Sequence, residues 1–253
     1  MDQIPHPVIP PINNDIMWIT LFCVMSGYLI WRHRGRSELS NTALMFFGAW
    51  SMFWQEFFSN WGGYLLYSPD LNLLPWGSTW WTAPNKPVFL IFSYPVFFTF
   101  IYTVLIFLLR KAHKALPAVP LLAISLIIAT PIFYGYNLLV DGASVDAGIW
   151  NYVDALGPVI TTSGGGAEPL LWPALPFAFY GALMAYSLMR VDEKGHPTFL
   201  RLGKPDRYAP GIKRETVRAL TSMLWWNAMY WFLLTMPVNL GRELFGHPSA
   251  LVP

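Results

Sequence analysis

Residues 54–87 have the sequence W-Q-E-F-F-S-N-W-G-G-Y-L-L-Y-S-P-D-L-N-L-L-P-W-G-S-T-W-W-T-A-P-N-K-P, and the first half of this stretch continues an apolar segment that begins near Ala43. At 3.6 residues per turn, Glu56 and Asn60 lie one turn apart on the same helix face. A carboxyl group inside a bilayer costs about 3 kcal/mol or more, so it usually faces a protein interior or a watery cavity. Glu56 is therefore the first candidate for a functional residue.

The composition is that of an integral membrane protein. Of the 253 residues, 55% are hydrophobic and only 12% are charged, and the mean hydropathy is +0.40. A soluble domain carries about twice that charged fraction. The length suits one compact helical bundle, so we expect a single membrane domain over residues 1–253.

The apolar segments predict an all-α integral membrane protein with six transmembrane helices. A proline-rich stretch at residues 1–14 precedes them and is expected to form an external arm. The expected spans are about residues 16–31, 42–67, 88–109, 118–139, 169–189 and 217–240.

The basic residues indicate the orientation of this bundle. Of the 16 lysines and arginines, 14 fall in or beside the connections after the first, third and fifth predicted spans. The exceptions are Lys86 and Arg242. By the positive-inside rule, the turns that carry the other 14 face the cytoplasm. Both termini are then extracytoplasmic, and we expect a multi-pass protein of the bacterial cytoplasmic membrane.

Polar and aromatic residues gather in the outer half of the predicted bundle. Carboxyl and amide groups among aromatic walls suit a lipophilic substrate that becomes cationic, because aromatic faces stabilise positive charge without reacting with it. The candidate catalytic residues are Glu56, Asp70 and Glu168. The candidate substrate-binding residues are Asn60, Asn72, Trp76, Trp80, Tyr136, Asn137, Asp141, Trp226 and Asn227.

Several of these residues also have purely structural interpretations. Trp76 and Trp80 fit an aromatic belt at the membrane surface, and Asn137 and Asn227 fit hydrogen bonds between helices. Glu168 would cap the fifth span, which would begin at Pro169. The sequence leaves both interpretations open.

No metal or cofactor is expected. The five histidines lie in the arm, in basic turns or near the end of the chain, and none forms a pair with ligand spacing on a helix. The single cysteine, Cys23, excludes an internal disulfide. No motif indicates a nucleic-acid partner or a hydrolase triad.

Two motifs carry a family resemblance. The segment W-Q-E-F-F-S-N-W-G-G-Y-L-L-Y-S-P-D-L-N-L-L at 54–74 and the segment G-G-G-A-E-P-L-L-W at 164–172 resemble the bacterial AveC-like spirocyclase family over about the central half of the chain. The resemblance implies a multi-pass membrane protein that closes a spiroketal on a polyketide. It assigns no role to any individual residue.

The leading hypothesis is a cofactor-free cyclase or isomerase of a polyketide-, terpenoid- or steroid-like metabolite. Glu56 would act as general acid and base, with Asp70 or Glu168 in a second proton-transfer role, and Asn60 and Asn72 would orient hydroxyl groups. The alternative is a non-catalytic membrane subunit or lipid-handling accessory protein. A small transporter is a third hypothesis, which the lack of an internal repeat disfavours. Membrane lipid is an expected partner, and a homo-oligomer or larger membrane complex remains open.

Overall fold

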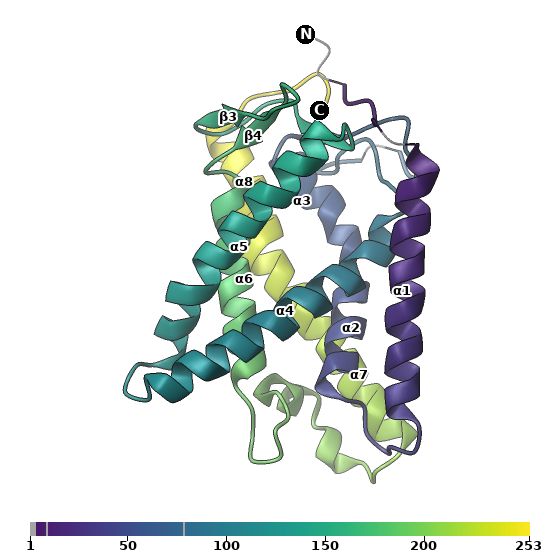
Figure 1. Ribbon diagram of the computed structural model, residues 1–253, viewed down its shortest axis with the longest axis vertical. Helices are drawn as coiled ribbons and strands as arrows, with labels where there is room; N and C mark the ends of the chain where they lie inside the picture. The colour runs from purple at the N-terminus through teal and green to yellow at the C-terminus, as the bar shows by residue number, and fades with distance from the viewer. Residues whose placement is uncertain (1–3, 9, 78) are drawn as a thin grey trace.

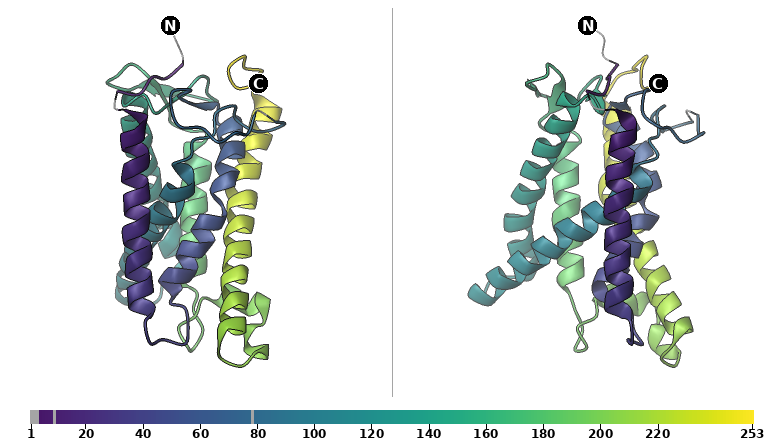
Figure 2. Two further views of the ribbon diagram at one scale, coloured as in Figure 1. Left: turned by 90° about the vertical axis from the view of Figure 1, so that its right-hand side faces the viewer. Right: turned by 45° about the vertical axis from the view of Figure 1, so that its right-hand side comes forward.

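The computed structural model describes residues 4–8, 10–77 and 79–253 as an elongated bundle of helices (Figure 1). The first helix begins, and the chain ends, at the same end of the bundle, which we call the terminal end (Figure 2). Residues 1–3 and 9 of the expected external arm lie outside the described residues.

The chain is mostly helical, as predicted. The helices are α1 (Pro11–His33), α2 (Asn41–Ser51), α3 (Glu56–Gly62), α4 (Leu90–Ala115), α5 (Leu121–Asp146), α6 (Ala174–Met189), α7 (Ile212–Tyr230) and α8 (Met236–Phe245). Short 3-10 turns lie at Phe53–Gln55, Thr198–Gly203 and Pro205–Arg207, and a π-helical turn lies at Trp231–Thr235.

Four three-residue strands depart from a purely helical fold. They are β1 (Leu65–Tyr67), β2 (Trp150–Tyr152), β3 (Val159–Thr161) and β4 (Ala167–Pro169). β1 pairs with β2 and β3 with β4, both antiparallel. These pairs were not expected from the sequence, because three-residue strands are too short to show an alternating pattern.

Three helices in the described part of the chain, α1, α4 and α5, are long and apolar enough to cross a membrane. The apolar helix α6 is shorter. α4 crosses the bundle obliquely between α1 and α5 (Figure 1).

Two predicted spans are interrupted, and one begins later than expected. The segment 42–67 divides into α2, a 3-10 turn, α3 and β1, and the segment 217–240 contains the π-helical turn between α7 and α8. The helix expected at 169 begins at Ala174, because Pro169 pairs with Val159 in the β3–β4 ladder. Glu168 therefore does not cap that helix, which excludes the structural interpretation of this residue.

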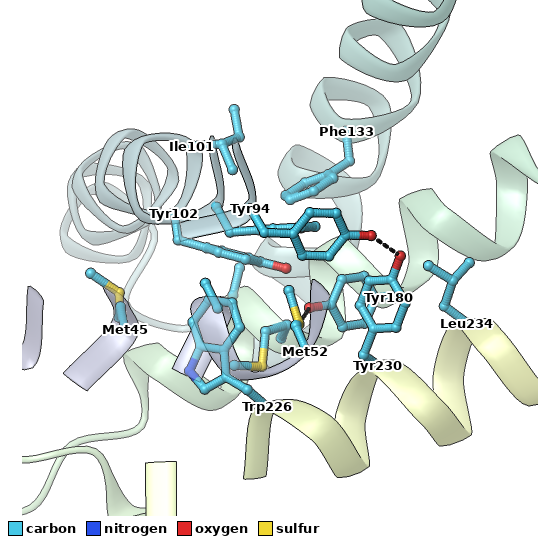
Figure 3. Close-up of a cluster of buried hydrophobic side chains, with 14 of the residues drawn as sticks. Met45, Met52, Tyr94, Ile101, Tyr102, Phe133, Tyr180, Trp226, Tyr230 and Leu234 are labelled. Atoms are coloured by element: carbon cyan, nitrogen blue, oxygen red, sulfur yellow. Dashed lines mark hydrogen bonds between the residues drawn. The ribbon is translucent and has the colours of Figure 1, made fainter. Parts of the chain in front are cut away.

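The core of the bundle is a cluster of aromatic rings. The Tyr102 ring packs edge-on against Trp226 with centroids 5.3 Å apart, and its centroid lies 5.3 Å from that of Phe133 (Figure 3). A glycine allows helix α2 to pack closely against Trp226 of α7 in this cluster. A Cβ added at Gly48 of α2 would lie 2.2 Å from the Trp226 indole. A fully buried indole cannot retreat from such a contact.

We expect Gly48→Ala to destabilise the protein by about 1–3 kcal/mol, because the added methyl group overpacks the core. The midpoint of thermal unfolding in detergent measures this effect. Gly27→Ala is the matched control, since it lies in helix α1 with nothing within 4 Å of an added Cβ. Alanine favours a helix over glycine by up to about 1 kcal/mol, so the control should keep or raise the midpoint. Equal midpoints for the two variants would contradict the packing described above.

Candidate functional site

A cavity of about 290 Å³ lies toward the terminal end of the bundle, between α1, α3, α4, α5 and the β1–β2 pair. Its wall is mainly apolar and aromatic, as is usual for sites that bind small lipophilic molecules. Five of the residues predicted from the sequence line it together: Glu56, Asn60, Tyr136, Asn137 and Asp141.

Glu56 is held on the cavity wall by three tyrosines. The Tyr67 hydroxyl donates to Oε1 and the Tyr230 hydroxyl to Oε2, each at 3.1 Å. Tyr94 also donates to Oε2, and the Tyr94 and Tyr230 hydroxyls lie 2.8 Å apart (Figure 3). None of the ion pairs in the described part of the chain involves Glu56. The carboxyl group is thus oriented by neutral donors and not neutralised by a cation.

Local structure explains how Glu56 reaches the cavity. A 3-10 turn ends at Gln55, and α3 begins at Glu56. The Gln55 amide points to the other side, where its Nε2 donates to Asn227 Oδ1 at 2.8 Å. Glu56 therefore faces the cavity, whereas its neighbour Gln55 faces α7.

Asp141 supplies a second carboxyl group on the same cavity. The Tyr152 hydroxyl donates to its Oδ2 at 2.6 Å, and Asn137, one turn earlier on α5, donates to the same oxygen at 2.9 Å. Asp141 was predicted to bind substrate and not to transfer protons. Asp141 lines the cavity, whereas Asp70 and Glu168, which were expected to take the second proton-transfer role, do not. Asp141 is therefore the better partner for Glu56.

Sequence reasoning missed three tyrosines and an asparagine on the wall: Tyr67, Tyr94, Tyr152 and Asn14. Tyr67 and Tyr94 lie in expected spans, where a tyrosine also fits core packing, and Tyr152 lies in the loop between the fourth and fifth expected spans. Asn14 was assigned to the external arm, whereas it lies in the first turn of α1. Its buried amide nitrogen has no hydrogen-bond partner in the structure.

The other predicted site residues lie outside the cavity. Asp70 pairs with His6 at 2.7 Å, and Asn72 donates to Asp15 at 2.5 Å. Trp76 and Trp80 are exposed on the loop before α4, Trp226 is in the aromatic core, and Asn227 joins α7 to the chain before α3.

Glu168 is buried outside the cavity. It is 1% exposed, and neither of its carboxyl oxygens has a hydrogen-bond partner in the structure. Burial, and to a lesser extent the charge of Asp141, raises the pKa of Glu168 from 4.5 to about 8. This carboxyl group is therefore largely protonated at neutral pH.

We expect Glu168 to make stability fall as pH rises. Its pKa is higher in the folded protein than in the unfolded chain, so between about pH 4.5 and 8 unfolding releases a proton and becomes more favourable with rising pH. Glu168→Gln removes this proton release. The variant should have a higher thermal midpoint than wild type at pH 8 and a flatter dependence on pH.

The control for this prediction is Glu193→Gln, which neutralises an exposed carboxyl group. It should retain the wild-type pH dependence. A Glu168→Gln midpoint that falls between pH 5 and 8 as steeply as that of wild type would show that Glu168 does not hold its proton in the folded state.

Comparison of the chain with protein-family models, curated proteins and solved structures finds no match. The functional argument therefore rests on the cavity and on the groups that line it.

Proposed function

We propose that the cavity binds a lipophilic metabolite and that Glu56 exchanges a proton with it, in a cyclisation or isomerisation that needs no cofactor. One observation carries this proposal: a carboxyl group lies on the wall of an aromatic cavity, held by three phenols and by no cation. A purely structural carboxyl group would be expected to contact a basic or amide partner, with no space beside it.

The tyrosines give Glu56 the orientation that proton transfer needs. Three donors from separate elements fix the plane of the carboxyl group, because each hydroxyl bonds one defined oxygen. A carboxyl group positioned within hydrogen-bond reach of a substrate contributes about 10²–10⁴-fold to a proton-transfer step. Asp141, on the same cavity, takes the second role, accepting a proton where Glu56 donates one.

The aromatic wall suits an intermediate that carries positive charge. Phe89, Phe97, Phe98 and Trp150 line the cavity. Ring faces stabilise a cation electrostatically but form no bond with it, so the intermediate stays free to react with its own hydroxyl group.

Spiroketal formation is the reaction of this kind that the family resemblance suggests. One hydroxyl group of a dihydroxyketone adds to the carbonyl carbon and gives a hemiketal. Protonation of the hemiketal hydroxyl breaks its C–O bond and releases water, leaving an oxocarbenium ion. The second hydroxyl group then attacks that carbon, and its proton passes to a carboxylate. Acid and base are regenerated when the proton that Asp141 accepts returns to Glu56, and no oxidant or reductant is consumed.

The proposal includes the membrane topology expected from the sequence. The six apolar segments cross the bacterial cytoplasmic membrane, and the terminal end with the cavity faces outward. The long apolar helices α1, α4 and α5, and the position of the start of α1 and of the C-terminus at one end of the bundle, support this arrangement.

The alternative is a membrane subunit that binds lipid without changing it. The apolar wall of the cavity would suit that function equally well. Only a chemical test of Glu56 separates the two functions.

We expect Glu56→Gln to lower the rate of spiroketal formation by about 10²-fold or more, since glutamine keeps the shape of the side chain but cannot transfer a proton. The assay supplies 1,9-dihydroxynonan-5-one to membrane vesicles at neutral pH. Chiral gas chromatography then measures the spiroketal and its enantiomeric excess, which separates enzymatic closure from spontaneous closure.

Glu193→Gln is the control, because this residue is exposed and does not line the cavity. It should retain the wild-type rate and enantiomeric excess. If Glu56→Gln also retains both, Glu56 does not transfer the proton. A wild-type product that is racemic and forms no faster than with empty vesicles would favour the lipid-binding alternative for this substrate class.

A further inference from the structure

The cavity reaches the outer surface of the bundle at one residue of α1. Met17 lines the cavity and is 47% exposed. Most of the other exposed side chains around it on this helix are apolar, namely Ile16, Ile19, Leu21 and Val24, and the polar exceptions are Asn13 and Thr20. Only 17% of the apolar window of α1 is buried, so its outer surface faces lipid if the helix crosses a membrane.

The opposite edge of this opening belongs to α5. Tyr136, Asn137 and Val140 line the cavity and are partly exposed, whereas Leu139 next to them is 76% exposed. α1 packs against α4, and α5 packs mainly against α6. α4, which passes between α1 and α5 in Figure 1, contributes Phe97 to the cavity wall, and the Phe97 ring centroid lies 5.1 Å from that of Tyr136.

The opening lies below the ends of the helices. Met17 is six residues from the start of α1, which corresponds to about 9 Å along the helix axis. Asn137 is nine residues from the end of α5, which corresponds to about 14 Å. A hydrocarbon layer of about 30 Å would cover both positions if the helix ends lie near its boundary.

The terminal end of the cavity is covered by the chain itself. β1 and β2 pair across it, with Leu65 opposite Tyr152. Asn72 is hydrogen-bonded to Asp15 beside the start of α1, and the Val8 amide donates to the Ala147 carbonyl at 2.9 Å. These contacts close the direction from which a water-soluble molecule would arrive.

We infer that the cavity exchanges its ligand sideways with the hydrocarbon of the bilayer, between α1 and α5 past Met17. The ligand class is therefore an uncharged molecule dissolved in the membrane. This inference rests on the proposed binding function of the cavity, but it is independent of the reaction at Glu56.

The test uses adamantyl diazirine, a compact, neutral, photoreactive hydrocarbon that partitions into membranes. The full chain is reconstituted in phosphatidylcholine vesicles and irradiated with the probe, and mass spectrometry maps the labelled residues. Phe98 and Tyr230 line the cavity and are 2% and 1% exposed, so labelling of either one requires the probe to enter the cavity. We expect both segments to be labelled in the wild-type protein.

Met17→Trp should block the opening and reduce labelling of these two residues at least fivefold. The matched control is Val24→Trp, the same large side chain on an exposed position of α1 that does not line the cavity. It should leave cavity labelling within twofold of wild type. Absent labelling in the wild-type protein, or unchanged labelling in Met17→Trp, would overturn the inference.

A second measurement remains valid even if the tryptophan variant folds poorly. A spin label is attached at Met17→Cys in a Cys23→Ala background and exposed to molecular oxygen or to a water-soluble nickel chelate. Oxygen should collide with the label more often, as it does in hydrocarbon, and a preference for the nickel chelate would indicate an aqueous opening. Cavity labelling without any spiroketal formation would leave the inference standing and count against the proposed reaction.

Discussion

The structure depends on keeping one carboxyl group, that of Glu56, inside an apolar bundle. Removing a carboxylate from water costs several kcal/mol unless hydrogen bonds replace those to solvent. Tyr67 and Tyr94 supply such bonds from β1 and α4, and Tyr230 supplies another from the end of α7. Three elements far apart in sequence must therefore approach one point. The cavity beside that point is the space that their rings and the first turns of α1 leave open.

The interruptions of the helices serve the same requirement. The 3-10 turn before α3 directs Gln55 toward α7 and Glu56 toward the cavity. On the other side, the π-helical turn follows Tyr230 directly and contributes Leu234 to the cavity wall, while Thr235 faces the Gln55 amide. A π-helical turn adds a residue to the helical repeat and shifts the side chains after it, and such turns often lie at functional sites. Regular helices through both segments would not present these side chains to the same surfaces.

The sequence predicted a residue's place in the site only where that place is set by the local helical repeat and not by contacts with distant parts of the chain. Glu56 and Asn60 lie one turn apart on a helix face, and the 3.6-residue period was enough to group them. Asn137 and Asp141 were selected at the end of the expected span 118–139, and α5 continues to Asp146, so they also lie one turn apart. The positions of Asp70 and Asn72 outside the cavity could not be predicted, because a loop has no such period. Their side chains are held by contacts with His6 and Asp15. Tyr94 could not be selected, since tyrosine in an apolar helix also fits the core, as Tyr102 and Tyr180 demonstrate.

Glu168 shows why burial alone does not identify a chemical role. Its carboxyl group is as deeply buried as any in the described chain, but it has no donor and no access to the cavity. A group in that position can hold a proton, yet it cannot pass that proton to a ligand without opening the fold around it. Glu56 differs in both respects, because donors orient it and the cavity gives it a free side. Proton transfer to a ligand needs orientation together with access, and among the carboxyl groups first proposed as catalytic only Glu56 has both.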